Sequence, residues 1–384
     1  MENETANNTS QSAGNPWFTV GADQVRLLRD GGAMFPALLD AVNSARSEVL
    51  MEMYWFGQDR VGVIVRDALL AAVKRGVRVR IIYDAFGSRT VPERFWQILD
   101  RERNASVRVY GPLAPWRKRF NLGRVFHRNH RKFIVVDGVH AFVGGINVGE
   151  EWWPQNGGTS WRDDAVELVG PTAQEVRSLF WRTWRRLGGF VPSGVPQIPA
   201  EGNGAVWLIA NDRRFSTRRE IRRTYLQEIR KARSSIDIAN AYFLPDRQVL
   251  RALVAARRRG VPVRVLVPQK SDVPAVTLAQ RSLLKHLIEK GIEVHAYGSS
   301  ILHAKTAVID DFATIGSYNL DYRYWRFNLE CNIAVFDKLF ADRVRKSFGD
   351  DLETSIKLGL DHLNNRPRLE KITSWILFHL HFLL

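Results

Sequence analysis

The pattern of apolar and polar positions predicts alternating helices and strands, and it does so twice along the chain. An amphipathic helix that begins near Ala68 ends at Gly76 and leads into a β-branched strand, and the same pattern runs from Ala252 past Gly260. A basic residue followed by glycine is a typical helix end, and β-branched runs favour strands. The chain therefore contains an internal repeat.

The segments that flank these units repeat as well. Each half has a preceding helix and strand, then a following helix and a short strand. The ranges are 41–56, 92–100 and 107–110 in the first half, and 228–243, 276–290 and 293–297 in the second. Helices that alternate with strands predict an α/β fold. We expect two pseudo-symmetric α/β/α halves, each a mixed, mostly parallel sheet flanked by helices.

Changes in composition predict the domain boundaries. Residues 1–20 are expected to form a disordered lead, because most of them are polar, and residues 191–204 are rich in proline and glycine, as linkers are. The two halves then span residues 21–190 and 205–357. The basic and apolar C-terminal tail, residues 358–384, is a candidate for membrane contact, and docking on the protein's own core is the alternative.

The charge of the chain is unusual, whereas its composition is not. Apolar residues make up 45% and charged residues 25% of the 384 residues, which is ordinary for a globular protein. The net charge of +16 favours polyanionic partners, either nucleic acid or an anionic membrane surface. The single cysteine, Cys331, excludes an intramolecular disulfide and a cysteine-rich zinc site. No run approaches the roughly 18 apolar residues of a membrane span.

The strongest chemical signal is a sparse pattern, H-x-K-x4-D followed by G-[GS]-x-N, that occurs once in each half. The two copies are His130, Lys132, Asp137, Gly144 and Asn147, and His303, Lys305, Asp310, Gly316 and Asn319. Alternation along a strand places the histidine and lysine on one face, and a following strand returns the glycine and asparagine to the same end. An isolated histidine on a strand is more often a core residue, but two equivalent copies favour a catalytic site.

The residue types of this pattern suit phosphoryl transfer without a metal. One imidazole can attack phosphorus while the other protonates the leaving alcohol. Two ammonium groups and two amides can stabilise the oxygens of a five-coordinate transition state. The sequence shows neither the carboxylate cluster of a magnesium site nor the histidine spacing of a zinc site. We therefore expect no metal and no cofactor.

The paired motifs resemble those of the phospholipase D superfamily. The resemblance covers about residues 22–357. Within the superfamily, this region is similar to bacterial cardiolipin synthases, in particular the shorter type without N-terminal transmembrane helices. The resemblance implies that the two halves share one active site, that one histidine forms a phosphohistidine, and that the other protonates the leaving group.

The resemblance also implies a role for each motif position. His130 and His303 would be the nucleophile and acid pair, with His130 favoured as the nucleophile. The phosphate would be held by Lys132, Lys305, Asn147 and Asn319. The motif aspartates, Asp137 and Asp310, would complete the catalytic motifs in a more structural role. An acidic residue downstream of each motif would orient its histidine, and the candidates are Asp163 or Asp164 for the first motif and Glu330 for the second.

The implied reaction is transfer of a phosphatidyl group between two phosphatidylglycerols, which yields cardiolipin and glycerol. The expected partners are an anionic phospholipid, phosphatidylglycerol, and the membrane surface, with the protein peripheral on the cytoplasmic side of the inner membrane. Two alternatives stay open: a phospholipase D that uses water and forms phosphatidic acid, and a nuclease or phosphodiesterase that the positive charge would suit. The intact motifs in both halves argue against a non-catalytic binding module.

Overall fold

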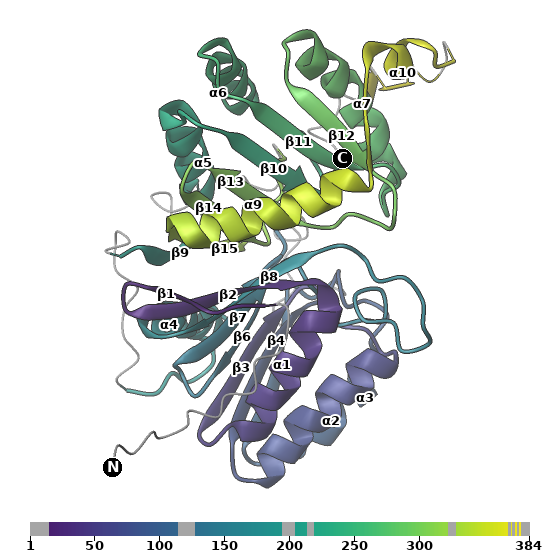
Figure 1. The fold of residues 1–384 in the computed structure, drawn as a ribbon. Helices are drawn as coiled ribbons and strands as arrows, with labels where there is room; N and C mark the ends of the chain where they lie inside the picture. The colour runs from purple at the N-terminus through teal and green to yellow at the C-terminus, as the bar shows by residue number, and fades with distance from the viewer. Residues whose placement is uncertain are drawn as a thin grey trace, which may run out of the picture.

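The computed structural model of the protein describes residues 15–113, 127–193, 204–212, 219–321 and 328–367, together with residues 370, 373–374 and 376–377. Each half forms one eight-stranded sheet, and the two sheets pack against each other with helices on the outer faces (Figure 1). The two mixed sheets flanked by helices confirm the predicted α/β fold of two repeated halves.

The first half holds the strands β1–β8 and the helices α1–α4. Their bounds are β1 (Phe18–Val20), β2 (Asp23–Arg29), α1 (Asp30–Ser44), β3 (Glu48–Met53), α2 (Arg60–Lys74), β4 (Arg78–Asp84), α3 (Glu93–Asp100), β5 (Ala105–Tyr110), β6 (Lys132–Val136), β7 (His140–Gly144), β8 (Asp164–Val169) and α4 (Pro171–Arg186). The strand order is β1-β2-β8-β7-β6-β3-β4-β5.

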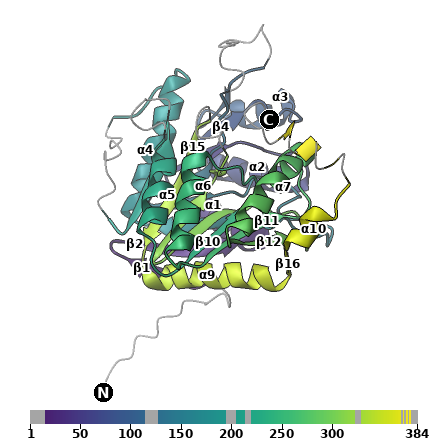
Figure 2. The ribbon, with the colours of Figure 1, turned by 90° about the horizontal axis from the view of Figure 1, so that it is seen from above.

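The second half repeats this arrangement. Its elements are β9 (Val206–Asn211), α5 (Glu220–Lys231), β10 (Ile236–Asn240), α6 (Arg247–Arg258), β11 (Val263–Pro268), α7 (Pro274–Glu289), β12 (Glu293–Tyr297), β13 (Lys305–Ile309), β14 (Phe312–Gly316), β15 (Glu330–Phe336), α9 (Lys338–Glu353), β16 (Ser355–Lys357) and α10 (Leu360–Asn364). The strand order is β16-β12-β11-β10-β13-β14-β15-β9. Figure 2 shows α5, α6 and α7 side by side over this sheet.

The pairing within the sheets corrects one expectation. Only β3, β4 and β5, and likewise β10, β11 and β12, pair in parallel, and the other pairs are antiparallel. The sheets are therefore mixed, but the prediction that they are mostly parallel was wrong. The reason is the length of the connections, because β6 and β7, like β13 and β14, are joined by turns too short for a parallel crossover.

A shared core joins the two halves. Apolar side chains of β8, among them Val166 and Leu168, form one cluster with side chains of the second sheet such as Val308, Ile315 and Ile333. The helix α9 of the second half lies along this junction (Figure 1) and contacts β2 of the first half. Burial of this common apolar surface holds the two sheets in one arrangement.

The two ends of the chain differ in part from the expectation. Phe18–Val20 form β1, paired with β2, so the disordered lead was wrong over its last residues; Val20 is buried and the Phe18 ring contacts Phe340. Residues 1–14, and residues 194–203 of the expected linker, lie outside the described residues. At the start of the tail, Leu363 of α10 packs into the core of the second half, while residues 378–384 are not among those described.

Within the described ranges, no helix combines the length and the apolar character needed to cross a membrane.

Candidate active site

The two motifs meet where β6 and β13 begin. Lys132 is the first residue of β6 and Lys305 the first residue of β13, and each motif histidine lies two residues earlier. All four side chains are buried. The histidines therefore precede their strands and do not lie on them, which modifies the geometry expected from strand alternation.

Backbone hydrogen bonds between the halves fix both histidines. The His130 N–H donates to the Leu329 carbonyl at 2.9 Å, and the His303 N–H donates to the Arg162 carbonyl at 2.7 Å. Each of these contacts belongs to a short parallel bridge between one half and the other. The position of each histidine therefore depends on the half that does not contain it.

The carboxylates that contact the histidines are exchanged between the motifs. Glu330, which follows the second motif, lies 3.1 Å from Nδ1 of His130 in the first motif. Asp163, which follows the first motif, lies 2.6 Å from Nδ1 of His303 in the second. We expected each acidic residue to orient the histidine of its own motif. That expectation was wrong, because the inter-half bridges place each histidine beside the strand of the other half.

The geometry also separates the two candidates Asp163 and Asp164. Asp163 accepts hydrogen bonds from His303, from Trp152 Nε1 at 3.1 Å and from the Asp164 N–H at 2.9 Å. The Asp164 side chain instead accepts from Arg162 and from Thr306, both at 2.6 Å. Asp163 is thus the residue that contacts the histidine, and Asp164 belongs to a neighbouring ionic network.

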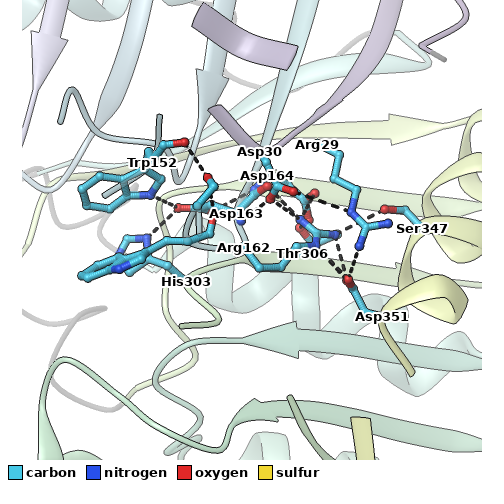
Figure 3. A network of polar contacts seen from close by, with 12 residues as sticks. Arg29, Asp30, Trp152, Arg162, Asp163, Asp164, His303, Thr306, Ser347 and Asp351 are labelled. Carbon is cyan, nitrogen blue, oxygen red and sulfur yellow. Dashed lines mark hydrogen bonds and ion pairs between the residues drawn. The ribbon is translucent and has the colours of Figure 1, made fainter. Parts of the chain in front are cut away.

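That network lies next to the Asp163–His303 pair and joins the halves (Figure 3). Its centre is the buried guanidinium of Arg162, which donates from Nε to both carboxylate oxygens of Asp351 on α9 at 2.9 Å. The same guanidinium reaches Asp164 and the hydroxyl of Ser347. Arg29 also donates to Asp351 at 2.6 Å. These charge-assisted hydrogen bonds hold the backbone that carries Asp163 against the second half.

The second position of the G-[GS]-x-N pattern is glycine in the first motif and serine in the second, and the neighbouring carboxylates explain this difference. A Cβ atom on Gly145 would lie 2.1 Å from Oδ1 of Asp163, so a side chain there would displace the carboxylate from His303. The corresponding Ser317 instead donates its hydroxyl to Oε2 of Glu330 at 2.5 Å. Serine at one position and glycine at the other therefore suit the different carboxylates, Glu330 and Asp163.

The two lysines place positive charge beside the histidines. Lys132 Nζ donates to the His130 carbonyl at 2.7 Å, and Lys305 Nζ lies 2.8 Å from Nδ1 of His303. Burial lowers the pKa of Lys132 to about 7 and that of Lys305 to about 8. Each ammonium group also lowers the pKa of His130. An anionic ligand between the lysines would relieve this repulsion.

The two histidine–carboxylate pairs differ in their electrostatics. Burial lowers the pKa of both imidazoles, that of His130 well below its usual value. Burial raises the pKa of Glu330 to about 8. Burial also acts to raise the pKa of Asp163, but Lys305 and His303 outweigh it and hold the value below the usual range. An ionised carboxylate therefore faces His303, whereas the carboxyl group beside His130 is largely protonated at neutral pH.

Each motif asparagine follows a strand that pairs with the strand on which the motif lysine lies. β6 pairs with β7 through Phe133 and Val143, and β13 pairs with β14 through Thr306 and Ile315. The segments that carry the asparagines follow β7 and β14, so they lie at the ends of β6 and β13 that carry the lysines. Asn147 Oδ1 accepts from the Trp55 N–H at 3.2 Å. The buried amide of Asn319 has no hydrogen-bond partner among the described residues, either for Oδ1 or for Nδ2.

The motif aspartates lie away from the histidines. Asp137 is at the far end of β6, roughly 16 Å along the strand from Lys132, and Asp310 holds the same place after β13. Asp137 accepts hydrogen bonds from the backbone N–H groups of residues 46–48, and Asp310 accepts from those of residues 233–235. Their inclusion among the catalytic residues is not supported, because both aspartates cap the start of a neighbouring strand.

Both aspartates also have a left-handed backbone, with φ of 51°. Aspartate tolerates this conformation better than most residues, and it suits the tight turn that each begins. The first turn has three residues, 137–139, and the second has two, 310–311, which accounts for the shorter spacing of the second motif.

Replacement of Asp137 by alanine should lower stability and leave the chemistry intact. The variant loses the cap of three backbone N–H groups, for which about 1–2 kcal/mol is expected in the free energy of unfolding. Urea unfolding would measure this loss, and kcat of the folded variant should stay within about twofold of wild type. A loss of kcat without a loss of stability would show that Asp137 acts in catalysis. Asp310→Ala is the matched variant of the second half.

Sequence reasoning missed three side chains that contact the histidine pairs. Trp152 donates to Asp163, Ser317 donates to Glu330, and the Tyr54 ring lies 4.6 Å from the His130 ring between centroids. Only Ser317 lay within a motif. Tyr54 lies in the repeated range 41–56 and Trp152 lies outside the repeated ranges, but neither belongs to the histidine–lysine or glycine–asparagine pattern.

The comparisons agree with this geometry. A family model described as "Cardiolipin synthase, PLD-like domain" matches residues 38–184 and 225–352. The major cardiolipin synthase of Bacillus subtilis (strain 168) is 32% identical over 90% of this chain and 72% of its own length. Cardiolipin synthase A of Pseudomonas putida (strain GB-1) is 32% identical over 91% of this chain and 73% of its own length.

A solved structure supports the fold. The crystal structure of phosphatidylserine synthase from Haemophilus influenzae Rd KW20 has a TM-score of 0.71 at 14% identity, and the match covers 96% of this chain and 95% of that one. At this identity the similarity shows the fold alone. The family model and the curated relatives go further and confirm the resemblance inferred from the motifs. The chain therefore belongs to the cardiolipin synthase family of phospholipase D-like enzymes.

Proposed function

We propose that this chain transfers a phosphatidyl group from one phosphatidylglycerol to a hydroxyl of another, which forms cardiolipin and releases glycerol. The proposal rests on one observation: two buried histidines, each paired through Nδ1 with a carboxylate of the other half, lie beside two buried lysines. Paired imidazoles can divide attack and proton transfer between them. The similarity to cardiolipin synthases supports cardiolipin as the product.

In the first step, Nε2 of His130 attacks phosphorus. The bond from phosphorus to the glycerol oxygen breaks, and that oxygen takes a proton from Nε2 of His303. The Ser317 carbonyl, 3.1 Å from Nδ1 of His130, can only accept a hydrogen bond. It therefore favours the tautomer with hydrogen on Nδ1 and a lone pair on Nε2.

His303 is better suited to hold the transferred proton. The ionised Asp163 at 2.6 Å stabilises an imidazolium on this ring. The negative charge of a bound phosphodiester would favour the protonated ring further. His130 has no ionised partner of this kind at neutral pH, because the pKa of Glu330 is raised by burial.

In the second step, the neutral His303 accepts a proton from the hydroxyl of the second lipid. The oxygen of that hydroxyl attacks phosphorus, and the bond between phosphorus and Nε2 of His130 breaks. Lys132, Lys305 and the free amide of Asn319 would hold the phosphate oxygens in both steps. The site thus returns to its starting state without a net gain or loss of protons.

We further propose that the protein works as a peripheral protein on the cytoplasmic leaflet of the inner membrane. The net charge of +16 supports this, because anionic lipids give that surface a negative potential.

The first experiment is product analysis with phosphatidylglycerol vesicles in the presence of a chelator. Cardiolipin and free glycerol in equal amounts are the expected products. Phosphatidic acid as the sole lipid product would replace the transferase with a hydrolase. Absence of lipid turnover, together with cleavage of a nucleic acid, would overturn the proposal in favour of the nuclease alternative.

The rate should fall in alkaline solution. The lysines attract a phosphodiester only as ammonium ions, and their pKa values in the free site are about 7 for Lys132 and about 8 for Lys305. Raising the pH removes these charges, so kcat/KM, which follows ionisations of the free enzyme, should decline from about pH 7 upward. Initial rates in mixed micelles would measure the decline.

An internal control accompanies this profile. A bound phosphate anion raises the pKa of both lysines, so kcat at saturating lipid should decline at higher pH than kcat/KM does. A kcat/KM that stays constant or rises between about pH 7 and about pH 9 would contradict the role of the lysines in phosphate binding.

A further inference from the structure

A second basic site lies on the first half, away from the histidines. It is a groove with a volume of about 410 Å³ between α4 and the strands β3, β4 and β5. The lining residues that matter for its chemistry are Arg78, Arg80, Arg108, Trp181, Trp184 and Phe190. The proposed reaction uses none of them.

The sheet register explains why the arginines gather. Arg78 and Arg80 are two residues apart on β4, so their side chains leave the same face. Arg80 pairs with Ser106 on β5, and Arg108 follows two residues later, so it shares that face. The same register places Leu50 of β3 beside Arg80. This face is the one that α4 covers, since Leu50 belongs to the same apolar cluster as Trp181.

The groove has an excess of positive charge. Within the described part of the chain, neither Arg78 nor Arg80 forms an ion pair with a carboxylate, and the nearby Glu48 is paired with Arg177. Burial and then the charge of Arg78 lower the pKa of Arg80, Glu48 acts in the opposite direction, and Arg108 lowers the pKa further. A ligand that brings negative charge into the groove would remove this repulsion.

The wall formed by α4 holds Arg108 in position and adds apolar surface. The guanidinium of Arg108 lies 4.7 Å from the centroid of the Trp184 ring and donates to the Leu187 carbonyl at 2.6 Å. The indoles of Trp181 and Trp184 line this wall, and Trp181 is 5% exposed. A ligand in the groove would therefore meet fixed positive charge beside apolar indole surface.

The end of α4 projects an aromatic ring beside this groove. Gly188, with φ of 66°, ends the helix, and a Cβ on the next residue, Gly189, would lie 2.0 Å from the indole nitrogen of Trp184. The chain thus turns tightly over the indole, and the following Phe190 is 85% exposed. An exposed aromatic side chain next to a cluster of arginines is suited to the interface of an anionic membrane.

This groove is separate from the catalytic cluster. Lys132 pairs with Met53 at one end of β3, and its side chain leaves the face that carries Met53 and Ile134. The groove lies on the opposite face, toward the end of β3 that contains Glu48. A ligand in the groove would therefore not occupy the site of the histidines.

We propose that the groove binds the phosphate of an anionic lipid headgroup while Phe190 inserts into the adjoining membrane interface. The arginines supply the charge that attracts the phosphate, and the indoles of α4 supply the apolar wall beside it. The site anchors the protein on the membrane independently of turnover. The proposal can therefore fail while the proposed reaction holds, and the reverse is also true.

The test is partitioning of the double variant Arg78→Glu, Phe190→Ser onto vesicles of phosphatidylglycerol and phosphatidylcholine in equal parts. Both side chains are exposed, so the fold should be unaffected. The matched control is Arg251→Glu, Leu339→Ser, which changes an exposed arginine and an exposed apolar residue of the second half. We expect partitioning of the groove variant to fall about tenfold or more, whereas the control should stay within about twofold of wild type.

Two results would overturn the proposal. The first is an equal fall for the groove variant and the control, which would show that charge anywhere on the surface suffices. The second comes from equilibrium dialysis with glycerol phosphate. If the groove variant loses binding of this soluble phosphate but keeps normal vesicle partitioning, the groove takes a free phosphate compound and does not bind the membrane.

Discussion

Replacement of either His130 or His303 by alanine is expected to lower the rate of phosphatidyl transfer by at least about 10³-fold. The two losses should be similar in size, because the inter-half hydrogen bonds place both imidazoles in one site. Cardiolipin formation from phosphatidylglycerol would measure both. The control is His286→Ala, since this histidine is exposed on α7. A variant of either motif histidine with more than about a tenth of wild-type activity would contradict a shared site.

A substrate with an acidic leaving group separates the roles of the two histidines. A nitrophenyl ester of phosphatidic acid releases a phenolate that needs no proton, so His303→Ala should recover release of nitrophenol while His130→Ala should not. The recovered variant should also accumulate phosphatidyl-labelled protein, with the label on His130 after proteolysis. Recovery by His130→Ala alone would reverse the assignment of nucleophile and acid.

The equivalent placement of the two motifs could be predicted from the sequence because it depends on the repeat, whereas their meeting in one site was implied by the resemblance to the phospholipase D superfamily. Two equivalent copies of a histidine and lysine before a strand, with glycine and asparagine after the next strand, must occupy equivalent places in two similar halves. The structure brings the two lysine ends together, since the charge of Lys305 acts on both His130 and Lys132. Even the one-residue difference in spacing has a simple cause, since it is the difference in length between the turns at Asp137 and Asp310.

The exchange of carboxylates between the motifs could not be predicted from spacing. Sequence distance shows that Asp163 and Glu330 follow their motifs, but not which half each faces. That is decided by the bridges between Arg162 and Leu302 and between Asn129 and Leu329, which form only when the sheets pack together. The antiparallel pairing of most strands could not be predicted for a related reason. The alternation of helices and strands does not reveal where a short turn replaces a crossover.

The exchange also bears on why one chain contains both halves. Each histidine takes its hydrogen-bonded carboxylate and its backbone partner from the other half. A separated half would contain one lysine and one histidine without the group that sets the tautomer of that ring. The buried pair of Arg162 and Asp351 strengthens the same junction. The catalytic geometry and the packing of the halves therefore depend on the same contacts.

Replacement of Asp163 by asparagine should have the second largest effect on activity, a fall of about 10²–10⁴-fold in kcat. The amide has the size of the carboxylate but no negative charge, so it cannot stabilise a protonated His303. Its NH₂ group could also donate to Nδ1, which would place the ring hydrogen on the reactive Nε2. Stability should fall by about 1 kcal/mol, because Trp152 and the Asp164 N–H donate to different carboxylate oxygens and the amide keeps only one of them.

Asp164→Asn is the matched variant, since it changes the neighbouring carboxylate in the same way. This residue contacts Arg162 and Thr306 and not the histidine. The loss of one charge beside the buried guanidinium should lower the free energy of unfolding by roughly 2 kcal/mol, while kcat of the folded variant falls by less than about tenfold. Urea unfolding and initial rates of both variants distinguish the two roles. If Asp164→Asn loses as much kcat as Asp163→Asn, the ionic network as a whole controls the protonation of His303, and the contact between Asp163 and His303 does not account for it alone.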